Sequence, residues 1–533
     1  MHEARRMDRL VQLFSQSRFD DVLTETATLM AAAPLTADLH QLRALAKSRI
    51  HGAQSATDDY RRALVTAPGH YFCYYNFANC LRTLGRPSEA KRNYGRAVAI
   101  TARLPEAFNN LGLLQQEDGD DAAAADSFRQ AIRGDGLCHA YRKNIAKLLL
   151  RQARHGDAAA ACRRALLLEP SSADAWTTLG LALDLRADYT EAQRCNRRAL
   201  AADPGLAVAR SNAALIDLRL GHFAQGWDGY GARKQPDIEV CNPDGTPLPR
   251  WPGGLPAGRR LLLWCEQGIG DQIMFLSLLP HLLRAGARVA LVIEDRMLAL
   301  VRRSFPEVEV IPERQMLAER RLATPADAWT FLGDLPRHLA LFCGGAARPV
   351  PWLVPDPDRA AALRRSLQAR HPGRRLVGIT WRSISPVDGG LRSIAPELWS
   401  PVLAVPGCAF ISLQYGATAA DGQAFHAATG RRPDIEHGIE PLVDLDGLAA
   451  LVGATDLAVC PVNNTVHFAG AMGRPGWTLL PRRPDWRWGL GTTWSRWYPS
   501  LTLFRQDAGD DWAPVMAAVA RDLAAWAVSR PAG

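Results

Sequence analysis

A strict period of 34 residues organises the first half of this chain. With register starts at positions 3, 37, 71, 105, 139, 173 and 207, two positions of the repeat keep their residue type without any gap. The twentieth position reads Val22, Ala56, Ala90, Ala124, Ala158 and Ala192, and the thirty-second reads Pro34, Pro68, Ala102, Gly136, Pro170 and Pro204. A period of this length predicts helical hairpins that stack into a solenoid, because one hairpin alone cannot bury its apolar face.

The residue sizes within the repeat support helical hairpins. Small residues at positions eight and twenty, such as Ala78 and Ala90, let two helices approach closely, and bulky residues at position twenty-four, such as Tyr94 and Phe128, fill the remaining space. Proline at position thirty-two ends the second helix because it cannot continue the hydrogen-bond ladder. This pattern resembles the tetratricopeptide repeat over about residues 3–236. The resemblance implies a superhelix at residues 1–236 whose groove holds a protein partner.

The seventh copy departs from the pattern. It reaches Gly221 normally and then carries Gly226, Trp227 and Tyr230, an aromatic face in place of the usual small and bulky positions. We expect this copy to be a capping helix that docks on the next domain.

Composition excludes several classes of protein. The chain has 533 residues and a net charge of +9, but its arginines are dispersed rather than concentrated on one segment, so we expect no nucleic-acid partner. Ten cysteines occur without a CxxC pair, which argues against a zinc site or a disulfide framework. Neither a signal peptide nor a stretch of transmembrane length is found in the sequence, so the expected location is cytoplasmic.

The pattern changes after a segment rich in proline and glycine at residues 237–258, which we interpret as a linker. Strand-like apolar runs then alternate with helical segments. This alternation predicts two Rossmann-like halves with parallel sheets, at residues 259–357 and 358–510, followed by a terminal helix at 511–533. The fold class is therefore an α-solenoid followed by α/β.

The strongest local signal for chemistry follows a predicted strand at Asp456–Cys460. There, Asn463, Asn464 and Thr465 stand at the start of a predicted helix, and His467 follows within its first turn. Backbone N–H groups and the positive end of the helix dipole favour an anion such as a diphosphate at this position. The alternative is ordinary capping of the helix beside a structural histidine.

This segment resembles the phosphate loop of two-domain GT-B glycosyltransferases, in particular the ADP-heptose:lipopolysaccharide heptosyltransferase-like group. Protein O-linked N-acetylglucosamine transferases are similar in joining a tetratricopeptide arm to a GT-B domain. The resemblance implies a GT-B arrangement of the two halves and a nucleotide-sugar donor bound by the helix start. The residue before Thr465 departs from the threonine that is commoner in those proteins, and the usual acidic residue is missing.

A second resemblance is the segment Glu266–Asp271, which follows the first predicted strand of the α/β part. In heptosyltransferase-like proteins the aspartate of this turn is the proposed general base, which implies that role for Asp271. The loop residues Gln267, Gly268 and Gly270 would then approach the acceptor, since glycines allow close backbone contact. The alternative is that Asp271 only caps its helix.

Further donor contacts are expected from strand ends of the second half. The related proteins carry a cation against the donor phosphates in the loop where Arg392 stands, with Arg382 as its competitor and Thr380 beside it. Gln414 and Tyr415 are candidates for the nucleotide base or ribose. Six tryptophans crowd into residues 477–512, and we favour packing over sugar binding for them.

These resemblances together imply a metal-independent, inverting glycosyltransferase that needs no cofactor beyond its nucleotide-sugar co-substrate. The repeat arm would present the acceptor, a glycan or a protein such as flagellin or another surface subunit. The alternative is a non-catalytic tetratricopeptide adaptor that carries a degenerate glycosyltransferase fold.

Overall fold

The computed structural model describes residues 2–32, 36–233, 235–254, 256–339, 351–385, 389–507 and 509–529. The chain forms two compact units, which meet in the sequence between Leu206 and Ala207. The first unit is a helical solenoid and the second contains two parallel sheets. Each unit is described by itself below.

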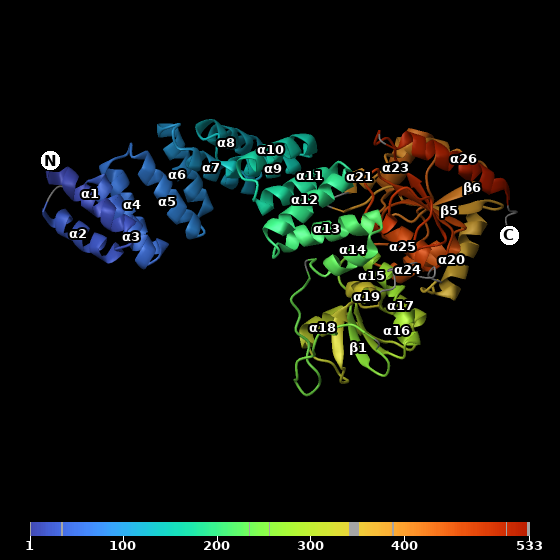
Figure 1. Ribbon diagram of the computed structural model, residues 1–533. Helices are drawn as coiled ribbons and strands as arrows, with labels where there is room; N and C mark the ends of the chain where they lie inside the picture. Colours follow the sequence, from blue (N-terminus) through green and yellow to red (C-terminus); the bar gives the residue numbers. More distant parts are fainter. Residues whose placement is uncertain are drawn as a thin grey trace. The chain divides into compact units, whose positions relative to one another are not determined.

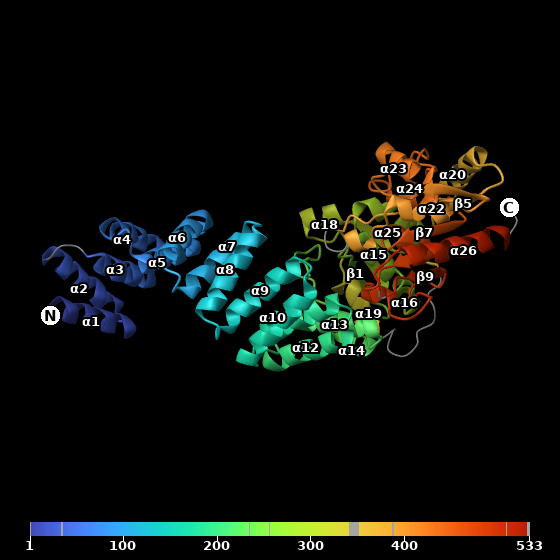
Figure 2. The same ribbon diagram turned by 90° about the horizontal axis from the view of Figure 1, so that it is seen from above.

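The first unit consists of antiparallel helical hairpins that succeed one another in chain order (Figure 1). From α3 on, the first helix of each hairpin begins 34 residues after the first helix of the preceding hairpin. The second helices follow the same spacing. The view turned by 90° shows the same succession of hairpins (Figure 2). The helices are α1 (His2–Ser15), α2 (Phe19–Ala32), α3 (Ala37–Ile50), α4 (Ala53–Thr66), α5 (Tyr71–Thr83), α6 (Pro87–Ile100), α7 (Pro105–Glu117), α8 (Asp121–Gly134), α9 (His139–Arg151), α10 (His155–Leu168), α11 (Ala173–Leu185) and α12 (Tyr189–Ala202).

Packing inside the hairpins confirms the predicted roles of small and bulky positions. A Cβ on Gly112 would lie 2.8 Å from Cε1 of Phe128, so only glycine fits opposite this ring. The alanines at the twentieth position, such as Ala90 and Ala124, are completely buried. The N-terminal unit is therefore a tetratricopeptide-like solenoid.

The seventh hairpin belongs to the second unit rather than to the solenoid, whose predicted end was residue 236. It consists of α13 (Ala207–Leu220) and α14 (Phe223–Tyr230). Trp227 packs edge-on against Trp486 at a centroid distance of 5.3 Å, and the Arg219 side chain donates a hydrogen bond of 3.1 Å to the carbonyl of Pro484. The hairpin keeps the helical period but buries its aromatic face on the α/β part, as the capping prediction expected.

The segment predicted to be a linker at 237–258 is packed on the first sheet. Its backbone turns tightly between Asn242 and Thr246, with Gly245 at a φ of 86°. Leu248 and Trp251 are buried, and the backbone N–H of Trp251 donates a hydrogen bond of 2.7 Å to the backbone carbonyl of Trp329. Proline and glycine here mark a hairpin turn rather than a free linker.

The first sheet is parallel, with the strand order β3-β2-β1-β4. Its strands are β1 (Arg260–Trp264), β2 (Arg288–Ile293), β3 (Glu309–Pro312) and β4 (Ala328–Phe331). The accompanying helices are α15 (Ile269–Leu276), α16 (Leu279–Arg284), α17 (Leu298–Ser304), α18 (Glu313–Glu319) and α19 (Leu335–Leu339), with 3-10 turns η1 (Asp295–Met297) and η2 (Leu332–Asp334). Apolar runs of strand length buried on both sides account for these four strands.

The second sheet is also parallel, in the order β6-β5-β7-β8-β9. Its strands are β5 (Arg375–Ile379), β6 (Cys408–Ser412), β7 (Leu457–Pro461), β8 (Gly476–Leu480) and β9 (Leu501–Arg505). The helices are α20 (Pro357–Arg370), α21 (Gly389–Arg392), α22 (Ser400–Leu403), α23 (Ala419–Thr429), α24 (Leu445–Ala454), α25 (Asn464–Ala471) and α26 (Ala513–Ser529), with η3 (Pro396–Trp399) and η4 (Trp486–Trp488). The second α/β half therefore forms as predicted. Among the described residues, no helix combines the length and the apolar character needed to cross a bilayer.

Candidate functional site

Both sheets change strand order at the point where candidate residues follow their strands. In the first sheet β1 lies between β2 and β4. In the second sheet β5 and β7 are neighbours, and the later strands are added on opposite sides of this pair, β6 beside β5 and β8 beside β7. Ligands of such sheets bind in the crevice beyond the carboxyl ends of the strands at this reversal. Asp271 follows β1, and Asn463 follows β7, so the topology places both at the expected edge of their sheet.

A cavity of about 230 Å³ brings residues of the two sheet regions together. Seven of the residues predicted from the sequence contribute to its wall, namely Gly268, Gly270, Asp271, Arg392, Asn463, Asn464 and His467. Val462, Asp485, Arg487 and Trp488 complete the wall. The predicted base, the predicted cation and the predicted helix start thus line one cavity.

Gly270 allows the two sides of this cavity to approach. A Cβ at this position would lie 2.8 Å from Cδ2 and 2.9 Å from Nε2 of His467, and 3.4 Å from Oδ1 of Asn464. These separations are shorter than, or at the limit of, ordinary van der Waals contact. A glycine in α15 is therefore required for close packing against α25, which explains why the segment Glu266–Asp271 contains it.

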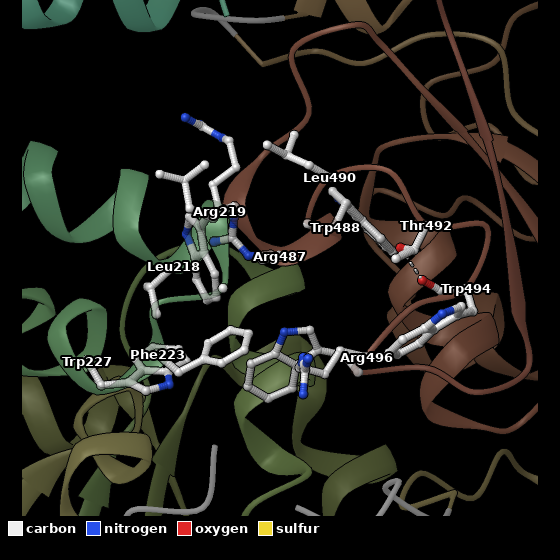
Figure 3. A pocket seen from close by; sticks show the side chains of 15 residues that line it. Leu218, Arg219, Phe223, Trp227, Arg487, Trp488, Leu490, Thr492, Trp494 and Arg496 are labelled. Atoms are coloured by element: carbon white, nitrogen blue, oxygen red, sulfur yellow. Dashed lines mark hydrogen bonds between the residues drawn. The ribbon is translucent and has the colours of Figure 1, made fainter. Parts of the chain in front are cut away.

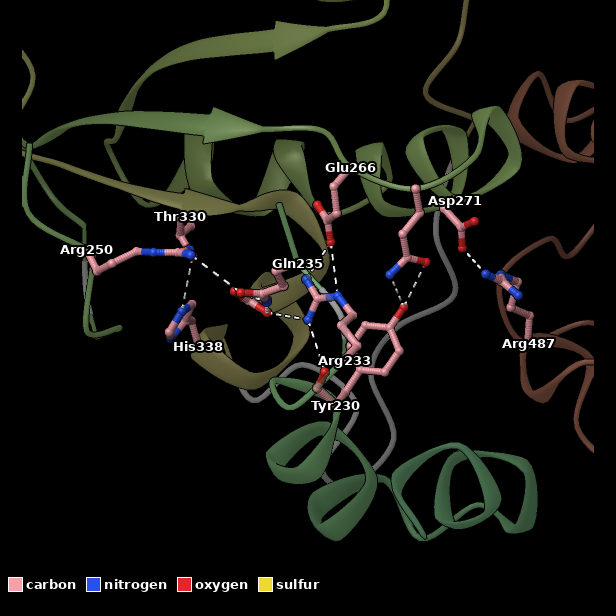
Figure 4. A network of polar contacts seen from close by, with 11 residues as sticks. Tyr230, Arg233, Gln235, Arg250, Glu266, Asp271, Thr330, His338 and Arg487 are labelled. Carbon is pink, nitrogen blue, oxygen red and sulfur yellow. Dashed lines mark hydrogen bonds and ion pairs between the residues drawn. The ribbon is translucent and has the colours of Figure 1, made fainter. Parts of the chain in front are cut away.

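The carboxylate of Asp271 is held by an arginine that sequence analysis did not identify. Asp271 and Arg487 form an ion pair whose side chains are 15% and 13% exposed (Figure 4). Nη1 of Arg487 also lies 2.5 Å from Oδ1 of Asp485. The guanidinium therefore fixes the orientation of the Asp271 carboxylate at the wall of the cavity.

The start of α25 is partly satisfied by its own N-cap. The Asn463 side chain accepts a hydrogen bond of 3.0 Å from the Thr465 N–H and donates one of 2.8 Å to Oγ1 of Thr380. Thr465 and Thr380 are completely buried and do not line the cavity. The predicted phosphate contacts of these two threonines are therefore not found. The backbone N–H of Thr465 is taken up by the capping side chain of Asn463, and the hydroxyl of Thr380 accepts a hydrogen bond from Asn463. Asn464 is half-buried and lines the cavity.

His467 is a neutral imidazole inside the site. Burial and the positive charge of Arg392 lower its pKa from 6.5 to about 3. Its Nδ1 lies 2.6 Å from the hydroxyl of Tyr498, and burial raises the pKa of that hydroxyl well above its usual range. The hydroxyl therefore stays protonated, and the imidazole carries no charge near neutral pH.

The two arginines proposed for the donor phosphates occupy different surroundings. Arg392, in α21, lines the cavity. Arg382 lies outside it: the guanidinium forms an ion pair with Asp421, and its Nη2 lies 2.5 Å from the carbonyl of Gly416. Arg392 thus shares a cavity with Asp271, whereas Arg382 fixes the loops beyond β5 and β6.

Gln414 and Tyr415, the candidates for the nucleotide, are both engaged by main chain. Oε1 of Gln414 accepts hydrogen bonds of 3.0 Å from the N–H groups of Trp381 and Arg382. The hydroxyl of Tyr415 accepts from the N–H of Ile384 at 3.1 Å. Both side chains are buried and neither lines the cavity, so the structure gives them the task of shaping the loop after β5.

Gln267 lies outside the cavity at the edge of a buried polar network. Its backbone adopts a φ of 68°, and its side chain donates to the hydroxyl of Tyr230 at 3.0 Å. Beside it, Arg233 forms an ion pair with Glu266, as Figure 4 shows, and a second one with Asp334. Burial raises the pKa of Glu266. This network fastens the segment after α14 to the loop that leads into α15, the helix of Asp271, and no local sequence pattern marked it.

The solenoid offers a second surface, a row of asparagines on its first helices. Asn76, Asn110 and Asn144 share the sixth position of successive repeats. Nδ2 of Asn144 donates to Oδ1 of Asn109 at 2.8 Å, and Nδ2 of Asn110 lies 3.2 Å from Oδ1 of Asn79. These partly buried amides supply both donors and acceptors, which is the chemistry that an extended peptide backbone requires.

No description of a known protein family matches the chain. The chain is 29% identical over 507 residues to Protein FlbA of Caulobacter vibrioides, which covers 91% of this chain and 84% of that protein. The FlbA match spans the solenoid and the α/β part alike.

Solved structures resemble parts of the chain. The Pseudomonas aeruginosa pilF structure aligns with a TM-score of 0.36 and 16% identity, over 39% of this chain and 95% of that chain. YrrB, described as a TPR protein with an unusual peptide-binding site, aligns with a TM-score of 0.30 and 18% identity, over 32% of this chain and 88% of that chain. The assignment of the solenoid rests on the helix spacing and packing described above.

Proposed function

We propose that the chain is an inverting glycosyltransferase that moves a sugar from a nucleotide-activated donor to an acceptor hydroxyl, with the two α/β halves acting in a GT-B arrangement. The observation that carries the proposal is the single cavity that Asp271, Arg392, Asn464 and His467 line together. A carboxylate, a guanidinium and a helix start around one space are the groups that a phosphate leaving group and an acceptor proton require.

In the proposed reaction Asp271 acts as general base. The acceptor hydroxyl gives its proton to this carboxylate while its oxygen forms a bond to the anomeric carbon of the donor sugar. The bond from that carbon to the phosphate oxygen breaks, and the nucleotide leaves with the negative charge. The ion pair with Arg487 supports this role because it holds the Asp271 carboxylate in a fixed orientation at the wall of the cavity.

The developing charge on the nucleotide is stabilised by Arg392 and by the start of α25. A guanidinium forms short, charge-assisted hydrogen bonds to phosphate oxygens, and the helix dipole adds to the attraction. In our proposal Tyr498 donates to Nδ1 of His467, which leaves the imidazole proton on Nε2, close to Gly270. A neutral imidazole then donates a hydrogen bond without adding a charge.

The solenoid contributes the binding of a protein partner in this proposal. Its stacked hairpins and asparagine row support recognition of an extended peptide, and the acceptor is a protein, such as a surface subunit, or a glycan carried on one. The second candidate is an adaptor without catalysis, and the pairing of Asp271 with Arg487 is the observation that favours it, because a carboxylate held in an ion pair is a weaker base.

Nucleotide sugars test the proposal directly. The melting temperature of the full chain is measured with UDP-, GDP-, ADP- and CMP-activated sugars, and a donor at 100 times its Kd stabilises by about 2.7 kcal/mol. We expect Arg392→Ala to weaken donor binding by about tenfold or more, and Asp271→Asn to preserve binding while donor hydrolysis or transfer is lost.

The exposed Arg365 of α20 provides the matched control, since Arg365→Ala removes the same charge away from the cavity. If none of the four donor types stabilises the protein, the transferase proposal fails and the adaptor remains. An Asp271→Asn variant with full activity would remove the base from the mechanism.

A further inference from the structure

A second cavity lies next to the candidate site in the same compact unit. It has a volume of about 370 Å³ and is formed by α13, α14 and the segment from Trp486 to Trp497 (Figure 3). Leu218, Phe223 and Trp227 contribute from the helices, and Trp488, Trp494 and Arg496 contribute from the segment. None of these residues was assigned a role beyond packing by the sequence.

The aromatic walls of this cavity are closely packed. Trp227, Trp486 and Trp497 are buried and contact one another edge-on, at centroid distances between 5.3 and 6.4 Å. Trp494 is different, because 44% of its side chain is exposed at the opening. A preformed aromatic cavity binds an apolar group without the entropic cost of ordering its own walls.

The charges around the cavity select the kind of occupant. The guanidinium of Arg496 lies over the ring of Phe223 at 4.5 Å and near Trp494 at 5.9 Å, and it forms no ion pair with any described residue. Of the described residues that line the cavity, none carries a carboxylate or an amide side chain. Sugar hydroxyls need hydrogen-bond acceptors as well as donors, whereas an apolar side chain beside an acidic one is complementary to these walls.

The aromatic cavity and the candidate site share part of their wall. Arg487 and Trp488 line both cavities. Arg487 pairs with the carboxylate of Asp271. The indole N–H of Trp488 is buried without a hydrogen-bond partner among the described residues. A group in the aromatic cavity is therefore one side chain away from the proposed base.

We infer that the aromatic cavity is an acceptor subsite that takes an aromatic or large aliphatic side chain of a polypeptide, with a neighbouring acidic residue of that polypeptide on Arg496. The role of this cavity as an acceptor subsite rests on the proposed function, but its binding of a peptide does not. The hydroxyl-bearing residue follows the anchored side chain and enters the adjoining cavity at Asp271. The enzyme thus selects acceptor sites in which a serine or threonine stands next to an apolar and an acidic residue.

A charge exchange tests this inference. Three blocked tripeptides serve as probes in titration calorimetry with the full chain: acetyl-Asp-Phe-Ser-amide, acetyl-Lys-Phe-Ser-amide and acetyl-Asp-Ala-Ser-amide. We expect the first to bind about tenfold more tightly than either of the others, since both the ring and the charge contribute. In Arg496→Glu the preference between the aspartate and lysine peptides is reversed.

Two variants control for indirect effects. Arg365→Glu reverses a charge of the same kind on an exposed helix and leaves all three affinities unchanged. Trp494→Ala removes the exposed ring at the opening and weakens the binding of acetyl-Asp-Phe-Ser-amide severalfold. The urea midpoint of unfolding stays that of the natural protein, because the ring lies at the surface.

The outcomes separate the two proposals. No binding of any peptide at millimolar concentration, or binding that Arg496→Glu does not alter, overturns the acceptor subsite. Binding of chitobiose in place of the peptides also overturns it and assigns the cavity to a glycan. Peptide binding with the expected charge reversal, combined with no response to any nucleotide sugar, leaves the subsite intact and refutes the transferase proposal alone.

Discussion

Replacing Gly270 by alanine tests whether the close contact between α15 and α25 builds the site. In most helices this substitution stabilises, by up to about 1 kcal/mol, because alanine has the higher helix propensity. Here the added Cβ would meet the ring of His467 at 2.8 and 2.9 Å. The ring cannot yield easily, because it is buried and its Nδ1 lies within hydrogen-bond distance of Tyr498.

The magnitude follows from the distance that must be regained. Ordinary contact begins near 3.4 Å, so the two helices must separate by about half an ångström. Overpacking of this kind costs about 1–3 kcal/mol. After the gain in helix propensity of about 1 kcal/mol is subtracted, we expect Gly270→Ala to lower the free energy of unfolding of the second unit by up to about 2 kcal/mol.

Tryptophan fluorescence follows the unfolding of this unit selectively. The chain has fifteen tryptophans, and Trp176 alone precedes Ala207 in the sequence. A urea titration monitored by fluorescence therefore reports almost entirely on the second unit.

Gly422 offers the matched control within that unit. A Cβ there would lie 4.0 Å from Cδ1 of Ile435, which is ordinary contact, and the residue lies inside α23. We expect Gly422→Ala to be neutral or stabilising by up to about 1 kcal/mol. If Gly270→Ala proves as stable as Gly422→Ala, the packing of α15 on α25 described here is wrong.

Three further predictions concern the same region. Asn463→Ala removes the cap of α25 and should lower the free energy of unfolding by about 1–2 kcal/mol, measured by urea titration. Glu266→Gln removes one of the two carboxylates that pair with the buried Arg233, and it should lower the free energy of unfolding by about 2–4 kcal/mol in the same assay. For His467 the folded-state pKa of about 3 lies below the value of 6.5 that an unfolded chain has, so the unfolded state binds the extra proton between these pH values. Stability that is complete above pH 6.5 should therefore decline by up to about 1.4 kcal/mol per pH unit on acidification, and His467→Gln should show a flatter profile.

Features that depend on local periodicity could be predicted from the sequence. The hairpin spacing and the two parallel sheets occur where the apolar pattern and the turn residues indicated. The cavity residue Asn464 was also found this way, because residue type and position after a strand were sufficient for it. Asp271 was found through the resemblance of its turn to that of known glycosyltransferases.

Pairings between distant segments could not be predicted. Arg487 follows Asp271 by 216 residues, and nothing in the local sequence of either marks the other. Gln414 stands at a strand end, where sequence analysis assigned it to the ligand, but its amide satisfies the N–H groups of the adjacent loop. A polar residue at such an edge serves either a ligand or the neighbouring backbone, and only the folded loop decides between them.

The predicted end of the solenoid differs from the observed one for a related reason. The seventh hairpin retains the helical period, so the sequence extended the repeat arm to residue 236. Its aromatic positions instead bury themselves on the second unit, where Trp227 and Tyr230 pack against Trp486. Periodicity fixes the secondary structure of a helix, but the partner of its apolar face is a tertiary property.

The short turn η4 explains why the tryptophan-rich segment is both packing and site. Successive residues of a tight 3-10 turn point in different directions, so three neighbours reach three surroundings. Trp486 joins the aromatic cluster on α14, Arg487 reaches Asp271, and Trp488 lies beside His467 at a centroid distance of 5.5 Å. The buried rings on either side hold the arginine in place, and a guanidinium held in this way orients a carboxylate at little further entropic cost. The aromatic packing that the sequence indicated is therefore the means by which this segment positions the proposed base.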